Sequence, residues 1–178
     1  MGDKRAFFVM GAESAGSKML TETLVKTGVQ GEYGHEQKLD TLDFSNINND
    51  IVFRRSVPHA KKWPPIAGII RRMRKFGFEV ILIWVNREDK YMELSQIART
   101  HAKTIEDAKG NIEDARWYIQ RELDAVEIVP KKVQYEDFVE SKTKRTEWLK
   151  QFDLKHPKGM KYFNGNKKYE GEDEPTTV

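Results

Sequence analysis

The chain has 178 residues, of which 38% are hydrophobic and 33% are charged, and its formal net charge is +3. This length and balance predict one soluble globular domain with its own hydrophobic core and exclude a disordered chain. The sequence contains no cysteine, which excludes disulfides, thiolate metal sites and cysteine nucleophiles. So small a positive charge does not indicate a nucleic-acid partner. Because no apolar run is long enough to cross a bilayer, we expect a cytoplasmic protein with no membrane partner.

Apolar runs and helical patterns alternate along the chain. Predicted strands cover residues 6–10, 51–53, 80–85 and 131–135, and the first and third are continuous apolar runs typical of strands buried on both faces. Apolar residues at helical spacing predict helices over residues 17–27, 66–76, 88–105, 112–126 and 136–152. This alternation predicts an α/β fold, a single three-layer domain with a mainly parallel sheet and right-handed crossovers.

Three further segments lie outside this alternation. Residues 29–50 are polar and predict a long loop. Residues 71–75 carry three arginines and a lysine, which predict a solvated helix face. The predicted domain covers residues 1–165, and the composition beyond it predicts a flexible C-terminal tail over residues 166–178.

The first predicted strand is followed by a glycine loop, residues 11–18 (G-A-E-S-A-G-S-K), and then by a helix, which is a P-loop-type arrangement. The N–H groups of residues 15–18 lie at the predicted helix start, where the helix dipole favours an anion. Ser17 adds a hydroxyl and Lys18 a charge. A nucleotide kinase needs the order G-K-[ST], whose serine or threonine holds Mg²⁺, and here Ser17 precedes Lys18 and Met19 follows it. The alternative is a glycine-bearing turn that binds nothing.

A second candidate anion site follows the strand predicted over residues 80–85. Arg87 comes directly after this strand, and Ser95 lies eight residues later. In a helix that starts near Glu88, Ser95 is about two turns in, roughly 11 Å along the axis. A bulky anionic group between them would accept a forked guanidinium contact and a hydroxyl donor. An arginine and a serine at this spacing are common, so the pair alone predicts little.

Taken together, these motifs resemble the sulfotransferase family. The loop fits S-x-G-[ST]-x-x-L, Arg87 and Ser95 fit R-x7-S, and Tyr135-Glu136-Asp137-Phe138 is similar to the family's Y-E-D-[LM] segment. The resemblance implies that the chain binds 3′-phosphoadenosine 5′-phosphosulfate (PAPS) or its product 3′,5′-adenosine bisphosphate (PAP). It places Arg87 and Ser95 on the 3′-phosphate and Tyr135 near the adenine. The residues that it places on the 5′-phosphosulfate are Ser14, Ala15, Gly16, Ser17, Lys18 and Met19.

The resemblance also implies a general base near the second predicted strand. Sulfotransferases often carry K-[TS]-H here, with the histidine accepting a proton from the acceptor. Residues 54–59 read R-R-S-V-P-H, so His59 is the candidate base, with Lys18, Arg54 and Arg55 to stabilise charge. His35, with Glu36 beside it, is the second candidate. Two positions depart from the family: Ser56 stands where its histidine would fall, and Ser14 where many members carry a lysine.

The sequence therefore predicts a metal-free sulfotransferase that transfers a sulfuryl group to a hydroxyl or amine. Its predicted partners are a small-molecule nucleotide and an acceptor that the sequence does not identify. One alternative is a P-loop kinase of a nucleotide or small metabolite, although Asn86 and Arg87 stand where a kinase needs an aspartate. Another is a nucleotide-binding protein without catalysis. The family's glycine-rich C-terminal segment has a possible counterpart in Lys167 and Lys168, within the predicted tail.

Overall fold

Five parallel strands form the sheet of the computed structural model, which describes residues 4–34, 36, 38–39, 41–59 and 61–170. The spatial order of the strands is β2-β3-β1-β4-β5. Their bounds are Lys4–Ala12 (β1), Gln30–Gly31 (β2), Ile51–Val57 (β3), Phe78–Asn86 (β4) and Lys131–Gln134 (β5). All four strand pairings are parallel, so the predicted α/β fold with a parallel sheet is confirmed.

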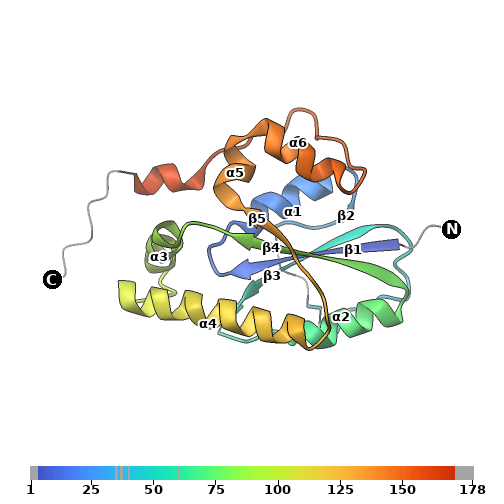
Figure 1. Cartoon of the computed structure of the whole chain (residues 1–178), viewed down its shortest axis with the longest axis horizontal. Coiled ribbons are helices and arrows are strands. Elements are labelled where there is room, and N and C mark those ends of the chain that lie inside the picture. Colours follow the sequence, from blue (N-terminus) through green and yellow to red (C-terminus); the bar gives the residue numbers. More distant parts are fainter. Residues whose placement is uncertain (1–3, 35, 37, 40, 60, 171–178) are drawn as a thin grey trace.

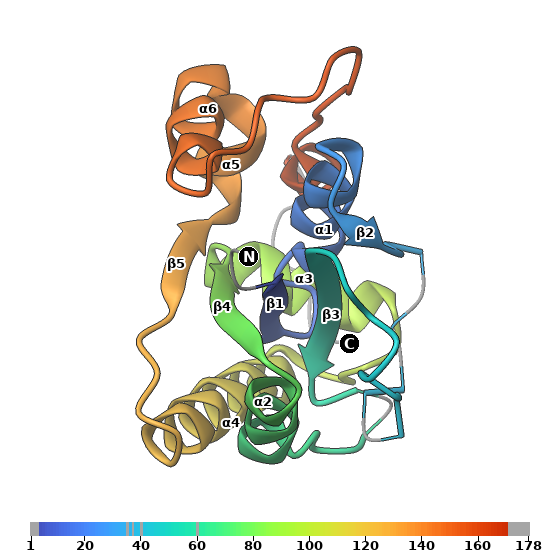
Figure 2. The same ribbon diagram turned by 90° about the vertical axis from the view of Figure 1, so that its right-hand side faces the viewer.

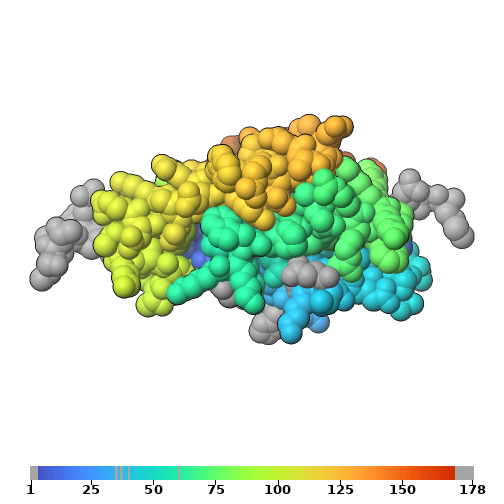
Figure 3. All heavy atoms as spheres, turned by 90° about the horizontal axis from the view of Figure 1, so that it is seen from below, coloured from blue at the N-terminus to red at the C-terminus, as the bar shows by residue number. Residues whose placement is uncertain are grey.

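Helices cover both faces of this sheet and give the three layers that were predicted (Figures 1 and 2). The helices α1, α5 and α6 lie on one face, and α2 and α4 lie on the other, whereas α3 sits at the carboxyl edge of the strands. Figure 3 shows α4 and α2 side by side across the second face. The bounds are Ser17–Lys26 (α1), Ile66–Lys75 (α2), Asp89–Ala98 (α3), Ile105–Asp124 (α4), Tyr135–Glu140 (α5) and Lys142–Lys150 (α6), followed by the 3-10 helix η1 (Gly165–Tyr169).

The central strand β1 organises the core. Its residues Ala6 to Met10 are fully buried because β3 and β4 pair with it on either side and helices cover both of its faces. The chain leaves β1 toward β3 on one side, and α2 then carries it across to β4 on the other side. The loops after neighbouring strands therefore diverge at β1, and this is where parallel α/β sheets open a crevice for a ligand.

Three helix boundaries differ from the prediction. The helix predicted over residues 88–105 is α3, which ends at Ala98. The helix α4 begins at Ile105 and runs through Gly110, where the sequence suggested a break. A capping box explains the earlier start, because Thr104 Oγ1 accepts from the Asp107 N–H and the Asp107 side chain accepts from the Thr104 N–H. The single helix predicted over residues 136–152 is two helices, because Ser141 adopts an extended conformation and caps α6.

The predicted solvated face of α2 is confirmed for Arg71, Arg74 and Lys75, which are exposed, whereas Arg72 is half-buried. Arg72 donates to the carbonyls of Leu39 and Leu42 at 2.9 and 2.7 Å, and Arg74 donates to Val126 O at 3.0 Å. The Arg72 contacts anchor the loop over residues 29–50, in which Leu39 is completely buried and which contains the short strand β2. The guanidinium groups thus satisfy loop carbonyls that would otherwise lack donors.

The predicted tail also begins too early. The segment 166–170 packs against the domain through Asn166 and Tyr169, which are 1% and 4% exposed. Of the predicted tail, residues 171–178 lie outside the described part of the chain. The Asn166 side chain is buried because it bonds to Arg87 and Glu136, as described below. Among the described residues, no helix is long and apolar enough to span a membrane.

The capping box gives a test of the start of α4. We expect Thr104→Ala to destabilise the domain by about 1 kcal/mol, the usual value of a lost N-cap, and to lower Tm by about 2–4 °C. Thr104 is exposed, so little packing is lost with its hydroxyl. Lys103→Ala, at the neighbouring exposed position, is the control. Equal Tm values for the two variants would contradict the assigned helix start.

Candidate functional site

A pocket of about 600 Å³ lies where the loops after β1, β3 and β4 meet, and we call it the carboxyl-edge pocket. The glycine loop and the start of α1 form one wall. Side chains from β3, from the end of α3, from the start of α5 and from the segment around η1 form the rest. Its lining residues are Ser14, Gly16, Ser17, Lys18, Met19, Glu22, Gly34, Arg54, Ser56, Arg87, Ser95, Arg99, Tyr135, Phe163, Gly165 and Lys168.

Eight of the nine residues predicted to bind the nucleotide line this pocket: Ser14, Gly16, Ser17, Lys18, Met19, Arg87, Ser95 and Tyr135. Ala15 is the exception. Its side chain is 1% exposed and its N–H donates to Ala12 O at 3.0 Å, so the expected contact from its amide is wrong. The physical reason is the tight course of the loop, in which Ser14 (φ 74°) and Gly16 (φ 89°) both have left-handed backbone and turn Ala15 inward.

The start of α1 presents hydrogen-bond donors at this wall. The helix begins at Ser17, and its N-cap residue, Gly16, supplies no side-chain cap. The first N–H groups of a helix have no partner within the helix, and the helix dipole gives them partial positive charge. The hydroxyl of Ser14 is also buried and has no hydrogen-bond partner within the described ranges. This wall is therefore suited to an anion.

Arg87 forms the floor of the pocket and is only 7% exposed. Its Nε donates to Asn166 Oδ1 at 2.7 Å, its Nη1 donates to Ser14 O at 2.9 Å, and its guanidinium lies 5.2 Å from the centre of the Tyr135 ring. Asn166 is held in turn, because its Nδ2 donates to Glu136 Oε1 at 2.8 Å. The position of the guanidinium is thus fixed from three sides. Burial lowers its pKa, although an arginine remains charged at neutral pH.

Two more arginines join Arg87 at the pocket. Arg54 comes from β3, and Arg99 comes from the end of α3. Burial lowers the pKa of Arg54, and repulsion from Arg99 lowers it further, while the Glu36 carboxylate opposes both effects. The Nε of Arg54 is buried and makes no hydrogen bond to the described residues. Three guanidinium groups and Lys18 around one pocket raise the local positive potential far above what a net charge of +3 suggests.

A buried carboxylate links this pocket to the predicted base. Glu36 is 4% exposed in its side chain, and its Oε1 accepts from the Ser56 N–H at 3.0 Å and from Ser56 Oγ at 2.6 Å. Its Oε2 lies 3.0 Å from His59 Nδ1. Arg54 and Arg55 lie 3.5 and 3.8 Å from the same carboxylate. The sequence placed Glu36 beside His35, but the fold pairs it with His59.

Of the three residues predicted to act in catalysis, one lines the pocket and two do not. Lys18 lines the pocket directly. His59 and Arg55 do not line it; they reach it through Glu36, whose other partners Ser56 and Arg54 are lining residues. Arg55 is 7% exposed, and its guanidinium faces the Glu36 carboxylate, so its charge serves to hold that group. His35 lies outside the described residues.

The sequence missed several residues of this site. Arg99 carries no motif signal except that it follows Ser95 by four residues, the spacing of neighbours on one helix face. Phe163, Gly165 and Lys168 belong to the supposed tail, yet they line the pocket, and the Gly165 N–H donates to Tyr135 Oη at 3.0 Å. The signal that could have found this segment is Tyr169, a large aromatic residue where a mobile tail would carry none.

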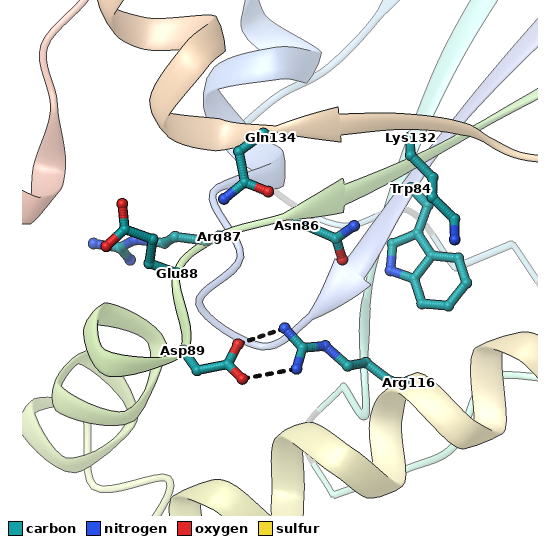
Figure 4. A pocket seen from close by; sticks show the side chains of 8 residues that line it. All are labelled: Trp84, Asn86, Arg87, Glu88, Asp89, Arg116, Lys132 and Gln134. Atoms are coloured by element: carbon teal, nitrogen blue, oxygen red, sulfur yellow. Dashed lines mark hydrogen bonds and ion pairs between the residues drawn. The ribbon is translucent and has the colours of Figure 1, made fainter.

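A second pocket, of about 470 Å³, lies on the other side of the Arg87 backbone (Figure 4). We call it the Trp84 pocket. Its cations already have partners: Arg116 makes a two-point ion pair with Asp89, and Lys132 Nζ lies 5.3 Å from the centre of the Trp84 ring. The acidic Glu88 also lines it. The carboxyl-edge pocket is therefore the better site for an anionic ligand.

Comparisons of the chain with protein-family models, with curated proteins and with solved structures each found no match. Within the ranges that the structure describes, no three His, Cys, Asp or Glu side chains are grouped as metal ligands would be.

Two glycines with left-handed backbone test the geometry of the loop. A Cβ at Gly16 would overlap the Tyr135 ring, whereas a Cβ at Gly28 (φ 104°) would meet nothing within 4 Å. We expect Gly28→Ala to cost about 1–2 kcal/mol, from left-handed backbone alone. Gly16→Ala adds overpacking of about 1–3 kcal/mol to that penalty. Urea unfolding measures both, and equal losses would mean that Tyr135 does not pack on the loop.

Proposed function

We propose that this protein is a sulfotransferase, which binds PAPS and transfers its sulfuryl group to a hydroxyl or amine. The observation that carries the proposal is the convergence of the glycine loop with Arg54, Arg87 and Arg99 on one pocket. These charges lie on separate elements, so they suit a ligand with two separated anionic groups more than a single phosphate. PAPS and PAP are nucleotides of this kind, with a 5′ group for the glycine loop and a 3′-phosphate for Arg87 and Ser95.

Aromatic side chains support a nucleotide over a simple polyanion. Tyr135 and Phe163 both line the pocket, and Phe163 is 69% exposed. An exposed aromatic ring beside cations is a platform on which a base stacks, a contact worth about 1–3 kcal/mol per base. Adenine at this position would leave both phosphate-bearing ends of the nucleotide within reach of the arginines.

The proposed reaction assigns a role to each catalytic side chain. The acceptor hydroxyl loses its proton to His59 Nε2 as its oxygen forms a bond to sulfur. The bond from sulfur to the 5′-phosphate oxygen breaks, and its electron pair stays on that oxygen, so the products are PAP and a sulfate ester. The Glu36 carboxylate, whose Oε2 lies 3.0 Å from His59 Nδ1, stabilises the imidazolium that forms. Lys18 and Arg54 offset charge on the transferred group and the departing phosphate.

A kinase is the alternative from the same fold class. It needs a hydroxyl after the loop lysine and an aspartate at a strand end, both for Mg²⁺. Met19 and Asn86 occupy these positions. A protein that binds the nucleotide without transfer is the second alternative, because the hydroxyl of Ser14 stands where many sulfotransferases carry a lysine.

Thermal shift separates these functions. We expect PAP at about 100 times its Kd to stabilise the protein by roughly 2.7 kcal/mol, which raises Tm by about 5–10 °C. ATP with Mg²⁺ should give a smaller shift. Arg87→Ala should remove about 1.5–3 kcal/mol of the PAP effect, the value of a hydrogen bond to a charged group.

The control for Arg87→Ala is Arg116→Ala, which removes a guanidinium from the neighbouring Trp84 pocket. Because Arg87 is buried, the Tm of each variant without ligand shows whether it still folds. Stabilisation by ATP with Mg²⁺ alone would refute the sulfotransferase and favour the kinase. A full PAP shift in Arg87→Ala would refute the assignment of Arg87 to the 3′-phosphate.

The rate of sulfuryl transfer tests the role of His59. We expect His59→Ala to lower the rate of PAP release from PAPS about 10²–10⁴-fold, the usual contribution of a general base. PAP affinity should stay within about twofold, because His59 is not among the residues that line the pocket. His156→Ala is the matched control, since His156 contacts Arg145 and not this site. Equal rates for His59→Ala and wild type would rule out His59 as the base.

A further inference from the structure

The turn that ends α3 brings to the pocket a residue that the motif resemblance does not assign. Arg99 is the C-cap residue of α3, and it lines the carboxyl-edge pocket between residues of β3 and the end of β4. Thr100, the next residue, has left-handed backbone (φ 60°), so the chain turns sharply away after it. This turn leaves the Arg99 side chain at the pocket and sends the following residues toward the glycine loop.

Two contacts fasten this turn to the glycine loop, and a third closes the turn itself. Gln96 Nε2 donates to Glu13 O at 3.3 Å, and the His101 N–H donates to Gln96 O at 2.8 Å. His101 Nδ1 also lies 3.1 Å from Glu13 Oε2. Gln96 is 2% exposed, and Asn111 Nδ2 donates to its Oε1, which fixes the amide. These bonds therefore fix the position of the backbone that carries Arg99 relative to the glycine loop, which would hold the 5′ group of the nucleotide.

The surroundings of Arg99 leave its charge available. It is exposed, and within the described part of the chain its guanidinium makes no ion pair or hydrogen bond. Arg54 and Arg87 are both close enough to feel it, since its repulsion contributes to the lowered pKa of each. Like charges held together in this way are stabilised by an anion between them. Glu22 is an acidic lining residue, and it comes from another element, α1.

We propose that Arg99 contacts the sulfuryl group of bound PAPS and supplies there the positive charge that Ser14 lacks. This inference rests on the proposed function. Negative charge in the transfer step gathers on the oxygens around sulfur and on the departing 5′-phosphate oxygen. A guanidinium at the end of α3 stabilises both, as donors aimed at developing charge do in other group transfers. The charge for the transferred group thus comes from the end of α3 and not from the glycine loop.

Comparing two ligands isolates this contact, because PAPS carries the sulfuryl group and PAP does not. Calorimetric titration would measure the Kd of each ligand for wild type, Arg99→Ala and Arg99→Lys. We expect Arg99→Ala to weaken PAPS about tenfold, the value of one charge-assisted hydrogen bond, and PAP less than about twofold. Arg99→Lys should recover part of the PAPS affinity. Lys103→Ala, a nearby exposed cation outside the pocket, should change neither Kd.

The outcomes separate the two proposals. If wild type binds PAP and PAPS but Arg99→Ala weakens both equally, or neither, the sulfuryl contact is refuted and the proposed function stands. If wild type binds neither ligand, the proposed function itself fails, and this inference fails with it. Because Arg99 is exposed, its variants should keep the wild-type Tm without ligand. A lowered Tm would show that the side chain is structural, which also overturns the inference.

Discussion

The site depends above all on the burial of one guanidinium group, that of Arg87. Removing a charge from water is costly unless hydrogen bonds replace those of the solvent. Asn166 and the Ser14 carbonyl supply such bonds, and the Tyr135 ring covers the group. These partners come from separate parts of the chain, so satisfying one charge joins the end of β4 to the glycine loop, α5 and η1. The walls of the pocket are the segments that this charge holds together.

The positive potential at the site follows from where the charged side chains lie and not from the overall composition of the chain. The arginines of α2 satisfy loop carbonyls at a distance from the pocket, and Arg116 is paired with Asp89. At the carboxyl edge, by contrast, Arg54, Arg87 and Arg99 share one pocket, and Glu36 offsets only part of their charge. A nearly balanced chain can thus present a strongly positive pocket, because the parallel sheet brings the loops after β1, β3 and β4 to the same edge.

Local sequence patterns predicted those elements that are determined by residues close together in the chain. The apolar run from Ala6 to Met10 identified the central strand, and the glycine loop identified the start of α1, because both signals lie within a few residues. Long-range contacts were beyond such rules. Asn166 looked like part of a polar tail because nothing nearby indicates that Arg87 needs its amide. The contact of Glu36 with His59 was not predicted, because it exists only after β3 has docked. Gly110 suggested a break that the Thr104 capping box outweighs.

The bond between Arg87 and Asn166 also bears on the order in which the molecule forms. The two residues are 79 positions apart, so about half the chain separates them. During synthesis, domains fold as the chain emerges, and early segments wait for late ones. The sheet around β1 gains β3 and β4 once residue 86 is available, but Arg87 lacks its amide partner until η1 arrives. The central strands β1, β3 and β4 can therefore pair well before the pocket is complete, and the pocket takes its final shape only when the last described segment has been synthesised.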